Sequence, residues 1–302
     1  MKVGTTMESI VDPINPAKHL SKWTLLPMEL LLLVFSLLPG RDLRAVVLVC
    51  RLWREVGELA RLWAWVHLPW RTREKPEVLG WRRLQAARQL QLGGRVGVTE
   101  ELLQAVVEHQ GLTKLSLGHT NLTSLEPGLL ARAVAGLQEL ELSYTCITSQ
   151  QAENVFTTIS ESSPLSRLHI VATGLTTVSP QLLATALARV KDVRLWHTSL
   201  SRQQARAIFL VLSVDARLKT LSLGYNSALA SVEPGLLARK VNVLEEVEVE
   251  PESCLTRLQV ERVLRQSLVK TSLRRLEIGG GKGGLDRELV EMAKQTIPVL
   301  YV

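Results

Sequence analysis

The sequence is poor in cysteine and in aromatic residues. Its three cysteines, Cys50, Cys146 and Cys254, are an odd number at wide spacings, which excludes a disulfide framework and matches no pattern of metal ligands. Aromatic residues make up only 4% of the 302 residues, whereas hydrophobic residues make up 46%. A chain that is rich in leucine and poor in aromatics favours many small repeated layers over one large aromatic core.

A long uncharged hydrophobic run is also missing. The densest leucine run, LLPMELLLLVFSLLPGRDL at Leu25–Leu43, has Glu29 near its start and Arg41 near its end. A membrane helix needs about 20 apolar residues without charge, so this run is too short to cross a membrane. About 20 mostly polar residues precede it, which disfavours a secretory signal. We therefore expect no membrane contact and a cytoplasmic location, and a nuclear location is compatible with the sequence.

The net charge of +7 is concentrated near the amino terminus. Residues 1–98 hold 15 Lys and Arg against 8 Asp and Glu, and the basic residues are densest in Arg71–Arg95. A basic segment can bind nucleic acid, so a nucleic-acid binder is one hypothesis for the chain. No nucleic-acid motif accompanies the segment, and a solvated connection between domains explains it more simply.

The pattern apolar-x-x-apolar-x-apolar recurs through the last two-thirds of the chain. The copies begin at Leu112, Leu137, Leu165, Val190, Leu218, Leu244 and Leu273. Their spacings are 25, 28, 25, 28, 26 and 29 residues, so short and long units alternate. The underlying unit is therefore a pair of repeats of about 53 residues. A weaker copy, ARQLQL, begins at Ala87.

Each repeat predicts one strand and one helix. The alternating leucines of the pattern are typical of a half-buried strand. The second half of each unit has apolar residues at helical spacing, after Ser or Thr followed by Pro or Gln-Gln, as in Ser124–Leu137 and from Thr148. One strand and one helix cannot bury their apolar faces alone, whereas stacked copies can. The repeats therefore predict a curved solenoid.

These repeats resemble the leucine-rich-repeat family over about Ala87–Val302. The resemblance implies an α/β fold of about eight units, with a strand plus a helix per repeat and a parallel sheet on the concave face. The positions that carry Asn or Cys in many such repeats are here Thr120, Thr145, Thr173, Thr198 and Asn226.

The residues between the strand leucines should face the concave side. Trp and Arg anchor protein interfaces most often, and both occur on the central strands of this face. We therefore predict a protein-binding surface around Trp196. Its predicted residues are Arg167, His169, Asp192, Arg194, Trp196, Glu246 and Glu248. The alternative is that these charges are ordinary solvated surface and that Trp196 folds against a neighbouring loop.

The leucine run near the amino terminus predicts three short helices in roughly 40 residues. Pro27 and Glu29 suit the first turn of a helix, Pro39-Gly40 ends it, and Asp42 can start the next. So small a helical unit cannot bury this much leucine by itself, and the surplus apolar surface predicts a partner.

This region also resembles an F-box over about Trp23–Leu62. The resemblance rests on Leu26-Pro27-x-Glu29-Leu30, Leu38-Pro39, Asp42-Leu43 and Val49-Cys50-x-x-Trp53. It implies that the helices bind the Skp-type adaptor of a cullin–RING ubiquitin ligase. The positions that would contact the adaptor or shape the interface are Leu26, Pro27, Leu30, Leu31, Phe35, Leu38, Leu43, Val49 and Trp53.

The sequence therefore predicts four segments. They are a tail at 1–22, an F-box at 23–62, a linker or irregular first repeat at 63–86, and leucine-rich repeats at 87–302. The two resemblances together imply a substrate-recognition subunit of a ubiquitin ligase, whose concave face holds a protein substrate. A scaffold or inhibitor that binds a protein without any ubiquitin role is the alternative.

No catalytic motif accompanies this organisation. The segment GGGKGG at Gly279–Gly284 lacks the Ser or Thr and the spacer of a phosphate-binding loop. No His pairs with a Cys or a carboxylate at the spacing of a metal site or a catalytic triad. We therefore expect a non-catalytic subunit without a metal or a cofactor.

Overall fold

The chain divides after Trp63 into two compact units, residues 1–63 and 64–302. The computed structural model describes residues 26–38, 40–68, 86–93, 98–109, 111–214, 216–249, 255–269, 271–279 and 284–302. The predicted tail at 1–22 and most of the predicted linker lie outside these residues. In the part of the chain that is described, no helix has the length and apolar character needed to span a membrane.

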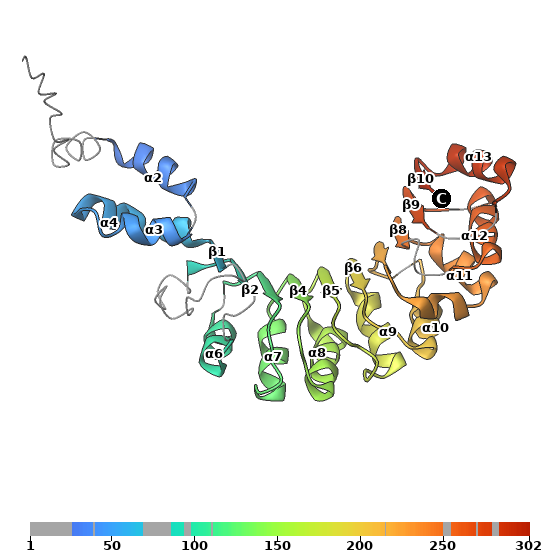
Figure 1. Ribbon diagram of the computed structural model, residues 1–302, viewed down its shortest axis with the longest axis horizontal. Coiled ribbons are helices and arrows are strands. Elements are labelled where there is room, and N and C mark those ends of the chain that lie inside the picture. Colours follow the sequence, from blue (N-terminus) through green and yellow to red (C-terminus); the bar gives the residue numbers. More distant parts are fainter. Residues whose placement is uncertain are drawn as a thin grey trace, which may run out of the picture. The chain divides into compact units, whose positions relative to one another are not determined.

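The first unit holds the three short helices that the leucine run predicts (Figure 1). They are α2 (Met28–Ser36), α3 (Gly40–Val46) and α4 (Arg51–Gly57), followed by the 3-10 turn η1 (Ala60–Trp63). Helix α2 begins after Pro27, whose carbonyl oxygen accepts hydrogen bonds from the amides of Leu30 and Leu31. The indole of the buried Trp63 donates to the carbonyl oxygen of Gly57 at 2.7 Å and ties the last turn to α4.

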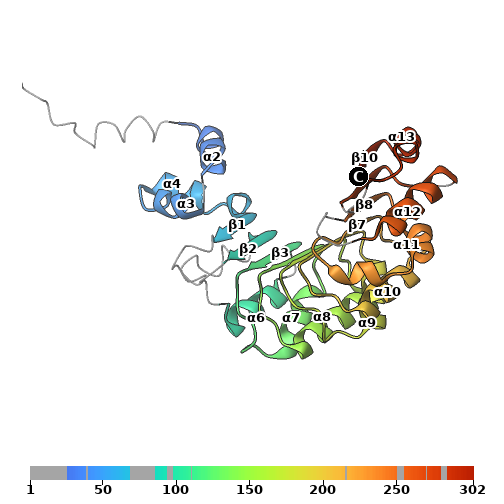
Figure 2. The same ribbon diagram turned by 45° about the vertical axis from the view of Figure 1, so that its right-hand side comes forward.

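The second unit is built on one parallel sheet of ten strands, in the order of the sequence (Figures 1 and 2). The strands are β1 (Trp65–Leu68), β2 (Gln89–Gly93), β3 (Lys114–Gly118), β4 (Glu139–Ser143), β5 (Arg167–Val171), β6 (Asp192–Trp196), β7 (Thr220–Ser222), β8 (Glu246–Val249), β9 (Arg275–Ile278) and β10 (Val299–Tyr301). All seven copies of the leucine pattern form strands, and so does the weaker copy at Ala87.

A helix follows each strand from β2 to β9. These helices are α6 (Glu100–Glu108), α7 (Pro127–Val134), α8 (Ser149–Ser162), α9 (Pro180–Arg189), α10 (Arg202–Val211), α11 (Pro234–Val241), α12 (Arg257–Val269) and α13 (Arg287–Thr296), with a 3-10 turn η3 (Ser227–Ser231) before α11. The strands line the inner side of this arc and the helices its outer side (Figure 1). The unit is the predicted leucine-rich-repeat solenoid with an α/β fold.

The register of the sheet stacks the repeat leucines into one apolar layer. The buried residues Leu115, Leu140, Leu168, Val193, Leu221, Val247 and Leu276 pair in register from β3 to β9. Because side chains alternate along a strand, the residues between them form rows on the opposite, concave side of the sheet.

Buried glutamines explain why the repeats come in pairs. Gln151, Gln204 and Gln259, one in each long unit, are fully buried and accept a hydrogen bond from the amide just before their own helix. Each also donates to two carbonyl oxygens of the preceding short unit. Gln204 bonds to those of Leu175 and Val178, both at 2.7 Å. The short units, whose helices begin with proline, lack this glutamine, so each glutamine ties a long unit to the short unit before it.

A second polar column runs inside the solenoid just beyond the strands. It consists of Thr120, Thr145, Thr173, Thr198 and Asn226, all of them buried. The hydroxyl of Thr145 donates to the carbonyl oxygen of Leu117 at 2.5 Å, and the amide of Asn226 donates to that of Leu195 at 2.7 Å. Thr145, Thr173 and Asn226 thus bond to carbonyl groups on the strand of the preceding repeat. The hydroxyl of Thr198 donates instead to the side-chain oxygen of Asn226.

Candidate functional site

Helix α2 of the first unit is apolar on two faces. Leu31 and Phe35 point into the core of the unit and are almost fully buried. On the outer face, Leu30, Leu33, Val34 and Leu37 follow the spacing i, i+3, i+4, i+7 and are 48%, 61%, 40% and 80% exposed. We call these four residues the α2 stripe. A helix that is apolar all round is usually buried, so the stripe is a surface that a partner would cover.

The predicted adaptor-binding residues fall into three groups in this unit. Pro27, Leu30 and Val49 are exposed, and Leu26, Leu38 and Trp53 are half-buried. Leu31, Phe35 and Leu43 are buried in the unit's own core. The ring of Phe35 packs edge-to-face on that of Trp53, with centroids 5.2 Å apart. The buried residues therefore shape the unit, whereas the exposed and half-buried ones are accessible to a partner.

Several exposed apolar residues lie outside the predicted set. They are Met28, Leu33, Val34, Leu37 and Leu48. The spacing of Leu30, Leu33, Val34 and Leu37 is visible in the sequence, and it identifies a helical stripe. What the sequence does not show is which of the two apolar faces of α2 turns inward.

On the second unit, the predicted substrate-binding residues lie in neighbouring rows of the concave face. The first row holds Lys114, Glu139, Arg167, Asp192, Thr220, Glu246 and Arg275. The second row holds Ser116, Glu141, His169, Arg194, Ser222, Glu248 and Glu277. Trp196 lies in a third row, in register with Val171.

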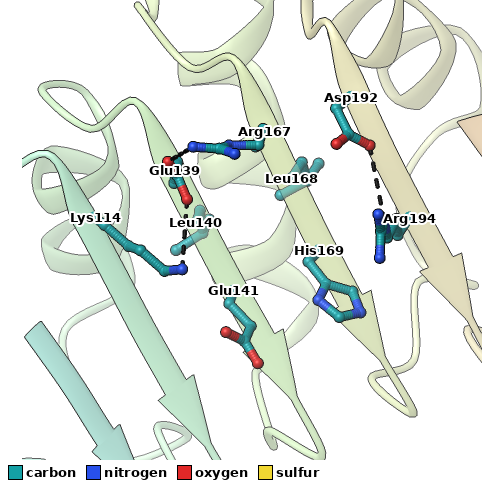
Figure 3. Close-up of a pocket in the computed structure, with 9 residues that line it drawn as sticks. All are labelled: Lys114, Glu139, Leu140, Glu141, Arg167, Leu168, His169, Asp192 and Arg194. Atoms are coloured by element: carbon teal, nitrogen blue, oxygen red, sulfur yellow. Dashed lines mark hydrogen bonds and ion pairs between the residues drawn. The ribbon is translucent and has the colours of Figure 1, made fainter. Parts of the chain in front are cut away.

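A pocket of about 210 Å³ opens on this face over β3 to β6 (Figure 3). Its lining brings together four of the predicted residues, Arg167, His169, Asp192 and Arg194. Trp196 does not line it, and Glu246 and Glu248 lie on β8, two strands beyond β6. The rest of the lining is Lys114, Glu139, Leu140, Glu141 and Leu168.

The charges of the pocket are largely balanced. Glu139 binds two cations at once, Lys114 at 3.4 Å and Arg167 on the next strand. The Arg194 guanidinium lies 3.9 Å from Asp192, which is an ion pair without a hydrogen bond between them. The strands around the pocket therefore present equal numbers of acidic and basic side chains, apart from His169.

His169 lies between Glu141 and Arg194 in this pocket (Figure 3). Burial lowers the pKa of His169 below its usual value, and the charges of Arg194 and Lys114 lower it further. The carboxylates of Glu141 and Asp192 act against this shift. The imidazole is therefore neutral at pH 7, and an anion bound beside it would favour its protonation.

The side chain of Trp196 is hydrogen-bonded to the next strand. Its indole nitrogen donates to the hydroxyl of Ser222 on β7 at 2.5 Å, and the side chain is half-buried. Farther along, Glu246 is exposed and Glu248 is half-buried on β8. Across the described residues, no group of three His, Cys, Asp or Glu side chains is placed to hold a metal ion.

Comparison with known proteins assigns the first unit. Residues 23–69 match the model of the F-box-like family. The chain thus combines an F-box-like domain with a leucine-rich-repeat solenoid, a fold that is typical of non-catalytic adaptor scaffolds. No curated protein sequence matches the chain significantly.

Solved structures are similar to this chain at low sequence identity. A chain in the crystal structure of the yeast Rad7 and Elc1 complex has a TM-score of 0.54 and 14% identity, over 94% of this chain and 89% of that one. The leucine-rich repeat-containing protein LegL7 of Legionella pneumophila has a TM-score of 0.45 and 15% sequence identity, and the match covers 75% of this chain and 78% of LegL7. A leucine-rich-repeat protein of Leptospira interrogans has a TM-score of 0.44 and 14% sequence identity, and the match covers 78% of this chain and 65% of that one.

Proposed function

We propose that this protein is the substrate-recognition subunit of a ubiquitin ligase of the Skp/cullin/F-box type. The observation that carries the proposal is an F-box-like domain with an outward apolar stripe, in a chain whose remainder is a repeat solenoid. The F-box-like domain docks a Skp-type adaptor, and through it the cullin–RING ligase. The fold neighbour from yeast, which was crystallised as a complex of Rad7 and Elc1, is consistent with an adaptor-binding role.

Docking at the α2 stripe would be driven by apolar burial. Each exposed leucine of the stripe that becomes covered contributes about 1 kcal/mol, at roughly 25 cal/mol per Å² of apolar surface. The helix carries Glu29 in its first turn and no basic residue in its last, so electrostatics adds little. Adaptor binding should therefore respond strongly to polar substitutions in the stripe and weakly to salt.

The concave face holds the protein substrate in this proposal. The residues assigned to it are Arg167, His169, Asp192, Arg194, Trp196, Glu246 and Glu248. The contribution of the chain to ubiquitin transfer is to position the substrate near the ligase, since proximity alone removes a large part of the entropic barrier. The chain itself performs no chemical step.

Co-expression with a Skp-type adaptor tests this proposal. We compare the wild-type chain with a variant that carries Leu33→Ser and Leu37→Ser, both at exposed positions of the stripe. The matched control carries Leu258→Ser and Val269→Ser on α12, which are exposed apolar residues of the second unit. Complex formation is followed by size-exclusion chromatography, and circular dichroism checks the fold of each variant.

The adaptor should co-elute with the wild-type chain and the control, and not with the stripe variant. A folded stripe variant that retains the adaptor would exclude the stripe as the docking surface. A folded wild-type chain that ignores the adaptor would favour the scaffold or inhibitor instead.

A further inference from the structure

A row of residues at the ends of the central strands adopts the left-handed backbone conformation. Its members are His119, Tyr144, Ala172, His197 and Tyr225, with φ of 55°, 54°, 49°, 52° and 56°. We call them the strand-end row. Residues other than glycine rarely adopt this conformation, and it costs about 1–2 kcal/mol each. Four of the five nevertheless carry aromatic rings, and such strained positions concentrate at functional sites.

The row is regular from one strand to the next. The amide of His119 donates to the carbonyl oxygen of Ser143, and the amide of Tyr144 to that of Val171, both at 2.7 Å. The amide of Ala172 likewise donates to the carbonyl oxygen of Trp196 at 2.8 Å. Strands β3 to β7 are consecutive in the sheet (Figures 1 and 2). Successive members of the row are therefore about 4.8 Å apart, the spacing of neighbouring strands.

The rings of the row stack on one another in two pairs. The rings of His119 and Tyr144 are nearly parallel, at 3°, with centroids 4.7 Å apart. Those of His197 and Tyr225 are at 16°, with centroids 3.9 Å apart. The two pairs form one ladder of rings that is interrupted only at Ala172. Tyr144, which borders the interruption, is 53% exposed, and His197 on the other side is also exposed.

The interruption has the width of one further ring. Tyr144 and His197 are two strands apart, so about 10 Å separates them along the row. A ring placed over Ala172 would lie about 5 Å from each, within the range of 4.5–7 Å that stacked aromatic pairs prefer. Trp196 leaves this space open, because its indole bonds to Ser222 on β7, on the side away from β5.

The chemistry around the interruption favours a neutral ring. The segments that border it, Leu142–Ile147, Ile170–Leu175 and Leu195–Leu200, contain no Asp, Glu, Lys or Arg. A guanidinium entering here would find no carboxylate on these segments, and a nucleotide would find no cation for its phosphate. A phenyl, phenol or indole group needs neither.

We propose that the space over Ala172 binds an aromatic side chain of a protein partner, which completes the ladder from His119 to Tyr225. Only the description of that partner as a ligase substrate rests on the proposed function. The stacking itself depends on the second unit alone. The aromatic side chain would anchor the partner at the carboxyl ends of the central strands, one residue beyond the strands that carry the pocket residues.

Methyl NMR of the full-length chain with labelled alanine tests the proposal. The probes are N-acetyl-tyrosinamide, with N-acetyl-leucinamide as the aliphatic control and N-acetyl-argininamide as the cationic one. We expect the tyrosine probe to move the Ala172 methyl signal upfield, because that methyl group would lie beneath a ring, and we expect neither control to do so. An equal shift with leucinamide, a larger effect with argininamide, or no shift with any probe would overturn the proposal.

A substitution that fills the space provides the second arm. Ala172→Tyr places at this position a residue that Tyr144 and Tyr225 already carry in the same backbone conformation. We expect it to raise the thermal midpoint relative to Ala172→Leu, which adds an aliphatic side chain at the same position. A midpoint below that of Ala172→Leu would contradict the stacking geometry. Neither arm involves the adaptor, so their failure would leave the proposed function standing, and loss of adaptor binding would leave this inference standing.

Discussion

Replacing Gln204 by alanine should weaken the solenoid at the boundary between two repeats. The side chain is fully buried and makes three hydrogen bonds to the backbone. Its amide nitrogen donates to the carbonyl oxygens of Leu175 and Val178, and its oxygen accepts from the amide of Ser201 at 2.8 Å. At about 1 kcal/mol for each net hydrogen bond, the substitution removes about 3 kcal/mol. The two carbonyl groups left buried without a donor make this a lower bound, unless water enters the space.

The neighbouring residue supplies the control for this experiment. Gln203 lies on the same helix and is exposed, so Gln203→Ala changes helix propensity equally without touching the repeat boundary. Unfolding in urea, followed by circular dichroism, measures both variants. A loss of about 3 kcal/mol is a large part of the 5–15 kcal/mol that stabilises a typical domain.

A difference between the two variants below about 1 kcal/mol would refute this account of the paired repeats, since it would mean that the buried hydrogen bonds contribute little. Hydrogen exchange locates the effect. The amides of α9 and α10 should lose protection first, because repeats in a solenoid contact mainly their neighbours.

Two further predictions concern His169 and Gly57. Because the pKa of His169 is lowered in the folded state, the unfolded chain binds more protons below about pH 6.5, and stability should fall as the pH drops through that value. His169→Gln should reduce this dependence in urea unfolding. In an NMR titration, Glu141→Gln should lower the pKa of His169 further and Arg194→Gln should raise it; shifts in the opposite direction would contradict the assignment of causes. Gly57→Ala would place a Cβ atom 2.7 Å from Val47, so it should destabilise the first unit by about 1–3 kcal/mol. Gly136→Ala, where no atom lies within 4 Å of the new carbon, should cost much less, and thermal unfolding of the two variants measures the difference.

The repeat architecture follows from the sequence because its cause is local and periodic. A buried residue at every second position of a strand, repeated seven times, leaves few alternatives to a stacked parallel sheet. Strands β3 to β9 and the inner rows of side chains were predictable for that reason. The helix starts were predictable as well, since Thr148 and Ser201 precede Gln-Gln and form capping boxes.

The features that decide recognition were harder to predict, because they depend on contacts between repeats. The sharing of Glu139 by Lys114 and Arg167 requires the register of three strands. The ladder of rings around Ala172 depends on a left-handed φ that no residue type at these positions signals. In the first unit, the outward turn of the α2 stripe is set by packing of the opposite face. Where backbone conformation and packing decide, the spacing of residues alone is insufficient.

Calorimetry of the full-length chain with a purified Skp-type adaptor tests the central claim most directly. Titrations at several temperatures and salt concentrations measure stoichiometry, affinity and heat capacity. We predict a one-to-one complex with a negative heat-capacity change, because binding buries the apolar α2 stripe, and an affinity that changes little with salt. Leu33→Ser with Leu37→Ser should weaken binding at least about tenfold, which corresponds to about 1.4 kcal/mol. No binding by the folded wild-type chain, or binding that ignores the stripe and falls steeply with salt, would contradict the account.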